Sequence, residues 1–262
     1  MNVIPEKCHF HFIALLPEPA EVAQFLARLK AVRPGLAIDG EGWKLVAAPR
    51  QFAFATLVDG PWSWRVVADL GELPGLAWRP GFGESRPPAH RSHAFVFLLS
   101  APQGASGLDR VRASLELAAA WIGVGASHLA FPSAGTILHR KDLEPLEPAR
   151  LGADSASNLL VSLVLMGRGA DGRTWIRTRG LVQFGLADLC YALPAMPQPP
   201  IEAIDAARVL FGSIAPYLIS NDRSLEPRET VRIGDRSWRV GDEAALAEAP
   251  PYYGVLRTLE RV

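Results

Sequence analysis

The sequence predicts an α+β fold, an α/β sandwich of mixed sheets with helices packed on them. Residues 93–99 are an almost uninterrupted apolar run, which is typical of a strand covered on both faces. Residues 108–124 then repeat apolar side chains at spacings of three and four, as an amphipathic helix does. Because residues 128–131 are a second short apolar run, we expect a strand–helix–strand crossover here.

The first part of the sequence predicts a strand, a helix and a hairpin in that order. Residues 9–16 form an apolar run that ends at a proline, and residues 22–32 repeat apolar side chains with helical spacing. Two strands are expected at residues 43–48 and 51–58, joined by a tight turn. This order is the opening of a split βαβ arrangement. Residues 61–78 are expected to be a short helix or irregular structure.

The loop expected at residues 79–88, which is rich in Gly and Pro, suggests a division of the chain. It separates an N-terminal α/β half, residues 1–88, from a C-terminal α/β half, residues 89–262. Residues 9–16 and 93–100 also echo each other, since both begin with His and continue through Phe and aliphatic side chains. Two ferredoxin-like half-domains and one continuous domain are both compatible with this pattern.

The C-terminal half begins with the crossover unit, whose helix is preceded by a capping box at Ser106. Residues 132–154 are expected to form a loop, and residues 159–166 a third buried strand. A bend with a short helix is expected at residues 180–189, and a longer helix follows that Pro216 kinks or ends. Further strands are expected at residues 174–178, 229–233, 236–240 and 252–259.

The amino-acid composition limits which classes of partner the chain can be expected to bind. Its 262 residues include 27 Lys and Arg and 27 Asp and Glu, so the formal net charge is zero. A neutral chain supplies no broad positive field for a polyanion, and we therefore expect no nucleic-acid partner. With 49% hydrophobic and 21% charged residues, the composition is that of an ordinary globular protein.

The two cysteines and the N-terminal residues indicate a cytoplasmic protein. Cys8 and Cys190 form no CxxC pattern and no dense framework, which favours reduced, buried thiols. The first residues lack a basic region followed by a long apolar run and a cleavage site. We therefore expect neither export nor a membrane partner.

A motif in the second half follows a buried strand and a hairpin, with Thr178, Gly180, Phe184, Gly185 and Asp188 in that order. It resembles a bacterial family, the domain of unknown function 4261. The upstream order of a buried strand, an Ala-rich helix and a short strand is similar too, so the resemblance covers about the later two thirds of the chain. It implies an α+β fold and no established catalytic residues. In physical terms the two glycines permit bends, Phe184 anchors the bend in the core, and Asp188 favours a nearby helix start.

Histidine placement suggests one chemical alternative. His9 and His11 lie two apart on a strand and point to one face, and His90 and His93 lie at the entry of a strand that could be its neighbour. Imidazoles that converge there could hold zinc or another divalent metal with an open position for water. This pattern defines the alternative function, a metal-dependent hydrolase. No acidic partner is fixed by spacing, and no catalytic motif is present elsewhere in the sequence.

A cluster of arginines around one tryptophan suggests a binding surface. Arg173, Arg177 and Arg179 share parity with Trp175 on the expected strand, so one face could present all four side chains. Arg and Trp are typical anchors of protein interfaces. We therefore predict a non-enzymatic cytoplasmic protein without a cofactor that binds another protein, such as an immunity or accessory protein in bacteria.

Overall fold

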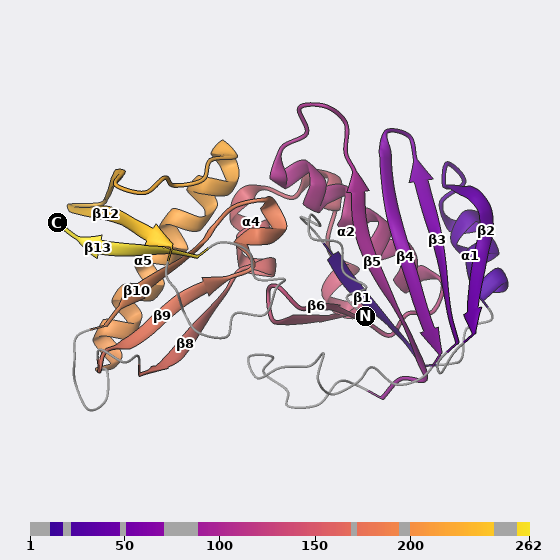
Figure 1. Cartoon of the computed structure of the whole chain (residues 1–262), viewed down its shortest axis with the longest axis horizontal. Helices are drawn as coiled ribbons and strands as arrows, with labels where there is room; N and C mark the ends of the chain where they lie inside the picture. The colour runs from indigo at the N-terminus through magenta and orange to yellow at the C-terminus, as the bar shows by residue number, and fades with distance from the viewer. Residues whose placement is uncertain are drawn as a thin grey trace. The chain divides into compact units, whose positions relative to one another are not determined.

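The computed structural model describes residues 11–17, 22–47, 51–70, 89–168, 172–193, 200–243 and 256–262 (Figure 1). The chain divides into two compact units, Met1–Leu151 and Gly152–Val262. The described part of each unit contains one sheet with helices packed on it, which confirms the predicted α+β class. The division lies after Leu151 and not after residue 88, because the strand that follows the expected boundary belongs to the sheet of unit 1.

Unit 1 is an antiparallel sheet with the N-terminal strand inside it. β1 (His11–Leu16) lies between β5 (Ser92–Ser100) and β6 (His128–Phe131) and is antiparallel to both. Helix α1 (Val22–Val32) follows β1, and helix α2 (Gly107–Gly123) connects β5 to β6 across β1. This is the strand–helix–strand crossover that the sequence predicts, in a split form with β1 between its two strands. The remaining strands are β2 (Ala37–Ala47), β3 (Gln51–Asp59), β4 (Trp62–Leu70) and β7 (Thr136–His139). The split arrangement predicted for the first strand, helix and hairpin is not found there, because three strands separate β1 from β2.

The similarity between residues 9–16 and 93–100 does not reflect two duplicated half-domains. β1 and β5, which carry the two similar runs, are neighbours in one sheet, with Ala14 opposite Ala94. Both are central strands covered on two faces, and this shared environment explains their similar apolar composition. Unit 2 also has a different strand order from unit 1, so the two units are not a pair of ferredoxin-like halves.

Several elements differ from those that the sequence predicts. Residues 62–70 form strand β4 and no helix, because Gly60 and Pro61 make a two-residue turn after β3 and Trp64 and Val66 then alternate into the core. The expected loop at residues 132–154 contains β7, helix α3 (Arg140–Leu143) and the 3₁₀ helix η2 (Pro148–Arg150).

The core of unit 1 lies between the sheet and its helices. The capping box at Ser106 is present: its hydroxyl accepts from the Asp109 N–H at 3.2 Å, and its own N–H donates to the Asp109 carboxylate at 3.2 Å. Trp64 Nε1 donates to Ser114 Oγ of α2 at 3.4 Å, inside the core. Arg33, after α1, forms ion pairs with Asp59 of β3 and with Glu116 of α2, which ties both helices to the sheet.

Unit 2 is a mixed sheet whose spatial order brings together strands from both ends of its sequence. That order is β11 (Thr230–Ile233), β12 (Arg236–Glu243), β13 (Leu256–Arg261), β10 (Asp188–Ala192), β9 (Thr174–Arg179) and β8 (Ser162–Arg168). β10 and β13 are parallel, and the other neighbouring pairs are antiparallel. The 3₁₀ helix η3 (Leu181–Phe184) joins β9 to β10, so the second part of the expected bend and helix is a strand.

Two helices pack in unit 2. α4 (Ala153–Leu160) contacts α5 (Ile201–Asn221), and α5 in turn contacts β9, η3 and β11. The helix continues past Pro216 to Asn221, so the proline does not end it. Among the described helices, α5 alone is long and apolar enough to cross a membrane, a test that core helices of soluble proteins also pass.

The core of unit 1 generates a stability prediction with a matched control. Leu57 of β3 is fully buried, whereas Leu99 of β5 is 43% exposed. Leu57→Ala should lower the free energy of unfolding by about 2 to 5 kcal/mol, because it leaves a cavity in a close-packed core. Leu99→Ala should cost under about 1 kcal/mol. Urea titrations followed by tryptophan fluorescence would measure both, and equal losses would contradict the packing described for this face.

Candidate functional site

The four histidines of the predicted metal site are not brought together in the part of the chain that the structure describes. His9 lies outside the described residues. His11 is opposite Phe97, whereas His93 is opposite Leu15, so the antiparallel register separates His11 from His93 by four positions. Four positions along a strand are about 13 Å. His90 and His93 do lie together, with ring centroids 6.1 Å apart, and both are buried.

Sequence reasoning missed another histidine pair. His128 of β6 and His139 of β7 are cross-strand partners, and their ring centroids are 4.8 Å apart. His139 Nδ1 accepts the Lys141 N–H at 3.2 Å and so caps α3. Within the described ranges no group of three or more His, Cys, Asp or Glu side chains is placed to hold a metal ion. The sequence predicts the strand of His128 but a loop where β7 lies, so it gives no cross-strand partner for that histidine.

The predicted arginine and tryptophan surface is only partly exposed. Trp175, Arg177 and Arg179 alternate along β9 and share one face, as the spacing predicts. The Arg173 guanidinium lies 5.9 Å from the centroid of the Trp175 ring, a cation–π distance. Arg177 and Arg179, however, are only 6% and 3% exposed. The two arginines therefore contribute to the interior of the chain.

A buried carboxylate organises the motif at residues 178–188. Asp188 is 1% exposed, and its Oδ1 accepts from Thr178 Oγ1 at 3.0 Å and from the Leu181 N–H at 3.1 Å. Its Oδ2 accepts from the Gly180 N–H at 3.4 Å. Gly180 has a φ of 120°, a conformation that residues with a side chain rarely adopt. Asp188 thus binds the first amides of η3, so the predicted link to a helix start is correct in space, although η3 precedes Asp188 in sequence.

Burial dominates the electrostatics of this motif. It raises the pKa of Asp188 from 3.8 to about 6, although the charge of Arg177 and the donated hydrogen bonds favour the ionised form. Burial also raises the pKa of the Cys190 thiol to about 12, which makes this cysteine a poor nucleophile. Neither Asp188 nor Arg177 lines the cavities of unit 2 described below. The motif is therefore a structural element of the β9–β10 connection.

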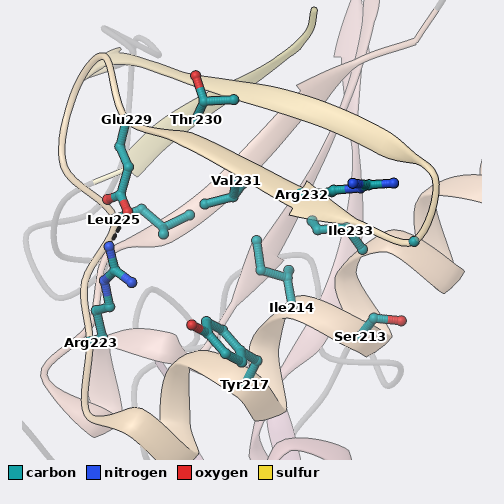
Figure 2. A pocket seen from close by; sticks show the side chains of 11 residues that line it. Ser213, Ile214, Tyr217, Arg223, Leu225, Glu229, Thr230, Val231, Arg232 and Ile233 are labelled. Atoms are coloured by element: carbon teal, nitrogen blue, oxygen red, sulfur yellow. Dashed lines mark hydrogen bonds and ion pairs between the residues drawn. The ribbon is translucent and has the colours of Figure 1, made fainter.

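A groove runs along α5 beneath the β11–β12 hairpin (Figure 2). One cavity of about 470 Å³ is lined by residues 229–234, by two residues after α5, and by Ser213, Ile214 and Tyr217 of the helix. A second cavity of about 430 Å³ shares Ser213, Ile233 and Gly234 with it. Because they share this lining, we treat them as one feature, the α5 groove.

The walls of the α5 groove come from alternate side chains of the hairpin. Val231 and Ile233 point from β11 toward Ile214 of α5 (Figure 2). Their cross-strand partners are Trp238 and Arg236. Both partners line the second cavity, together with Tyr191 and several alanines of α5. An ion pair between Arg223 and Glu229 lies at the other end of the groove.

The helix side of the α5 groove joins the core face of α5 to an exposed apolar stripe beside it. The core face carries Ala207, Leu210 and Ile214, which the sequence predicts and which also reach the groove. Val209 and Tyr217, however, are 72% and 50% exposed and line the groove. Apolar side chains on two faces of one helix were the signal that sequence reasoning could have used to find this surface.

Comparison of the chain with protein-family models, with curated proteins and with solved structures finds no match. The resemblance to the domain of unknown function 4261 therefore stays a prediction from the sequence.

The buried carboxylate generates a prediction about pH. The pKa of Asp188 is higher in the folded state, so the folded protein binds the proton more tightly than the unfolded chain does. Stability should therefore rise as the pH falls through about 6, and Asp188 should add about 1 to 2 kcal/mol between pH 7.5 and pH 5. Asp188→Asn should lose this increment, whatever its stability at neutral pH. Urea unfolding of both proteins at the two pH values would measure it, and identical pH dependence would contradict the burial argument.

Proposed function

We propose that this chain is a non-enzymatic protein-binding protein of the cytoplasm and that it holds a partner protein in the α5 groove. The observation that carries the proposal is the exposed apolar stripe of α5 beside the two cavities. Val209 is 72% exposed and Tyr217 is 50% exposed, although both line a concave surface. Burial of such side chains against a partner removes apolar area from water and favours association.

The composition of the groove also supports a protein partner. Tyrosine, tryptophan and arginine are enriched where proteins bind one another, and the groove is lined by Tyr191, Tyr217, Trp238 and Arg236. The proposal moves the binding surface from the face of Trp175 to α5, because Arg177 and Arg179 are buried. An immunity or accessory role in bacteria belongs to the same proposal, as does the expectation of no nucleic-acid or membrane partner.

The alternative of a metal-dependent hydrolase finds no geometric support among the described histidines. It requires His11 and His93 to converge, and the register of β1 and β5 sets them four positions apart. A protein-binding role, in contrast, needs only the surface that α5 and the hairpin present.

The proposal predicts the effect of placing charge in the α5 groove. The double substitution Val209→Glu and Tyr217→Glu should weaken a complex formed there by more than about tenfold, because it places two carboxylates in an apolar contact. Leu165→Glu on β8 is the matched control, because Leu165 is also apolar and is 51% exposed at the opposite edge of the sheet. Quantitative co-purification from the native cell would compare the wild type with the two variants.

The control variant should retain every partner that the wild type retains. If the folded double variant also retains all of them at wild-type levels, the α5 groove is not the binding surface. Circular dichroism of both variants would establish that the unit remains folded.

A further inference from the structure

The backbone of β11 carries hydrogen-bonding groups that face away from the sheet. Within the described residues β11 pairs with β12 alone, and the two strands are joined by the two-residue turn Gly234-Asp235. In such a hairpin the pair that flanks the turn exchanges both backbone hydrogen bonds, and narrow and wide pairs then alternate. Ile233 and Val231 therefore bond to β12, whereas the N–H and C=O groups of Thr230 and Arg232 point to the open edge.

A hydrogen bond further along the hairpin fits this alternation. The Val240 N–H donates to the Glu229 carbonyl at 2.8 Å, so this carbonyl is the next group after Val231 that bonds inward. The ladder is irregular beyond it, because the Val240 carbonyl accepts the Arg228 N–H at 2.7 Å and the Glu229 N–H donates to the Glu226 carbonyl. The open edge of β11 thus offers two donors and two acceptors, from Thr230 and Arg232. A strand placed beside β11 could satisfy all four groups.

The open edge lies beside the α5 groove. Consecutive residues 229–234 line the first cavity, and Ser213, Ile214 and Tyr217 of α5 line it from the other side. In an added strand, successive side chains would point to opposite faces, so every second side chain would enter the groove. The groove-facing positions would meet Val231, Ile233 and Tyr217, which favours apolar side chains there.

Charge distinguishes between possible strands. The hairpin from residue 230 to residue 240 carries three Arg and one Asp, a formal charge of +2. Arg232 and Arg239 lie on its outer face and are exposed, and neither takes part in an ion pair within the described ranges. Like charges opposite one another oppose pairing of β11 with β11 of a second copy. Acidic side chains on the outward positions of a partner strand would instead be attracted.

We propose that the partner supplies an extended acidic segment, which adds to the edge of β11 as a further strand and places alternate apolar side chains in the α5 groove. This inference rests on the proposed function and specifies its binding mode. Four main-chain hydrogen bonds would give affinity, and the groove would select the apolar side chains.

Synthetic peptides test this mode without a known partner. The probes are capped, fluorescent ten-residue peptides in which Asp alternates with one apolar residue, either Val, Ile, Leu or Phe. At least one should bind by fluorescence anisotropy, and hydrogen exchange should slow at the Thr230 and Arg232 amides. N-methylation of the peptide amides that face β11 should weaken binding by about tenfold or more, because each lost hydrogen bond costs about 0.5 to 1.5 kcal/mol. Replacement of Asp by Lys should also weaken it.

A variant of the chain provides the complementary test. Arg232→Pro removes an outward N–H while it leaves the bonds between β11 and β12 in place, so it should weaken binding by about tenfold. Arg232→Lys keeps the amide and the charge and should bind within about twofold of the wild type. If the proline variant does not fold, the N-methylated peptide with the wild-type chain still decides the question.

The outcomes separate this inference from the function on which it rests. Failure of every alternating peptide to bind, or equal affinity of the N-methylated and parent peptides, would overturn strand addition. Loss of a native partner from the Val209 and Tyr217 variant would then still support the α5 groove as the binding surface. Sedimentation that shows a dimer of the wild type, and a monomer of Arg232→Pro, would overturn the acidic segment in favour of a second copy.

Discussion

A carboxyl group removed from water holds the connection between β9 and β10. Thr178, Gly180 and Leu181 all donate to Asp188, so one side chain fixes the end of a strand, a glycine with positive φ and the first turn of η3. Helix α5 packs on both β9 and η3 and also contacts β11. The helix that lines the α5 groove therefore packs on the segment that Asp188 orders. Loss of these hydrogen bonds would leave a buried carboxylate without its donors, which is more costly than loss of a surface contact.

Side-chain spacing in the sequence was sufficient to predict the helices and strands that have a strong hydrophobic period. The helix after Ser106 begins as its capping box requires, and the alternation of β3 and the order of β5, α2 and β6 follow from side-chain spacing and turn residues. β4 differs from the short helix or irregular stretch that the sequence predicts, because Gly60 and Pro61 form a two-residue hairpin turn that pairs Asp59 with Trp62. The pairing of β1 with β5 joins residues about 80 positions apart, and a long-range register of this kind has no local signal.

For the candidate site as well, local patterns were predictable and long-range contacts were not. Spacing correctly placed Trp175, Arg177 and Arg179 on one face, because the alternation of a strand is a local property. Whether that face meets water depends on the rest of the fold, and here Arg177 lies near the buried carboxyl group of Asp188. The α5 groove depends on two elements that each have a readable pattern, but only the fold shows that the hairpin lies over the exposed apolar stripe of the helix.

The position of β13 has a consequence for how unit 2 forms during translation. This strand lies between β10 and β12, and it joins the β8–β9–β10 meander to the β11–β12 hairpin. Until it leaves the ribosome, β10 and β12 each have an open edge with buried side chains such as Leu189 and Val240. Until then the two parts of the sheet remain unpaired and expose apolar edges. Such a state is prone to aggregation and is a typical substrate of chaperones. The sheet described in unit 1 has no such dependence, because its strands precede unit 2 and it can close first.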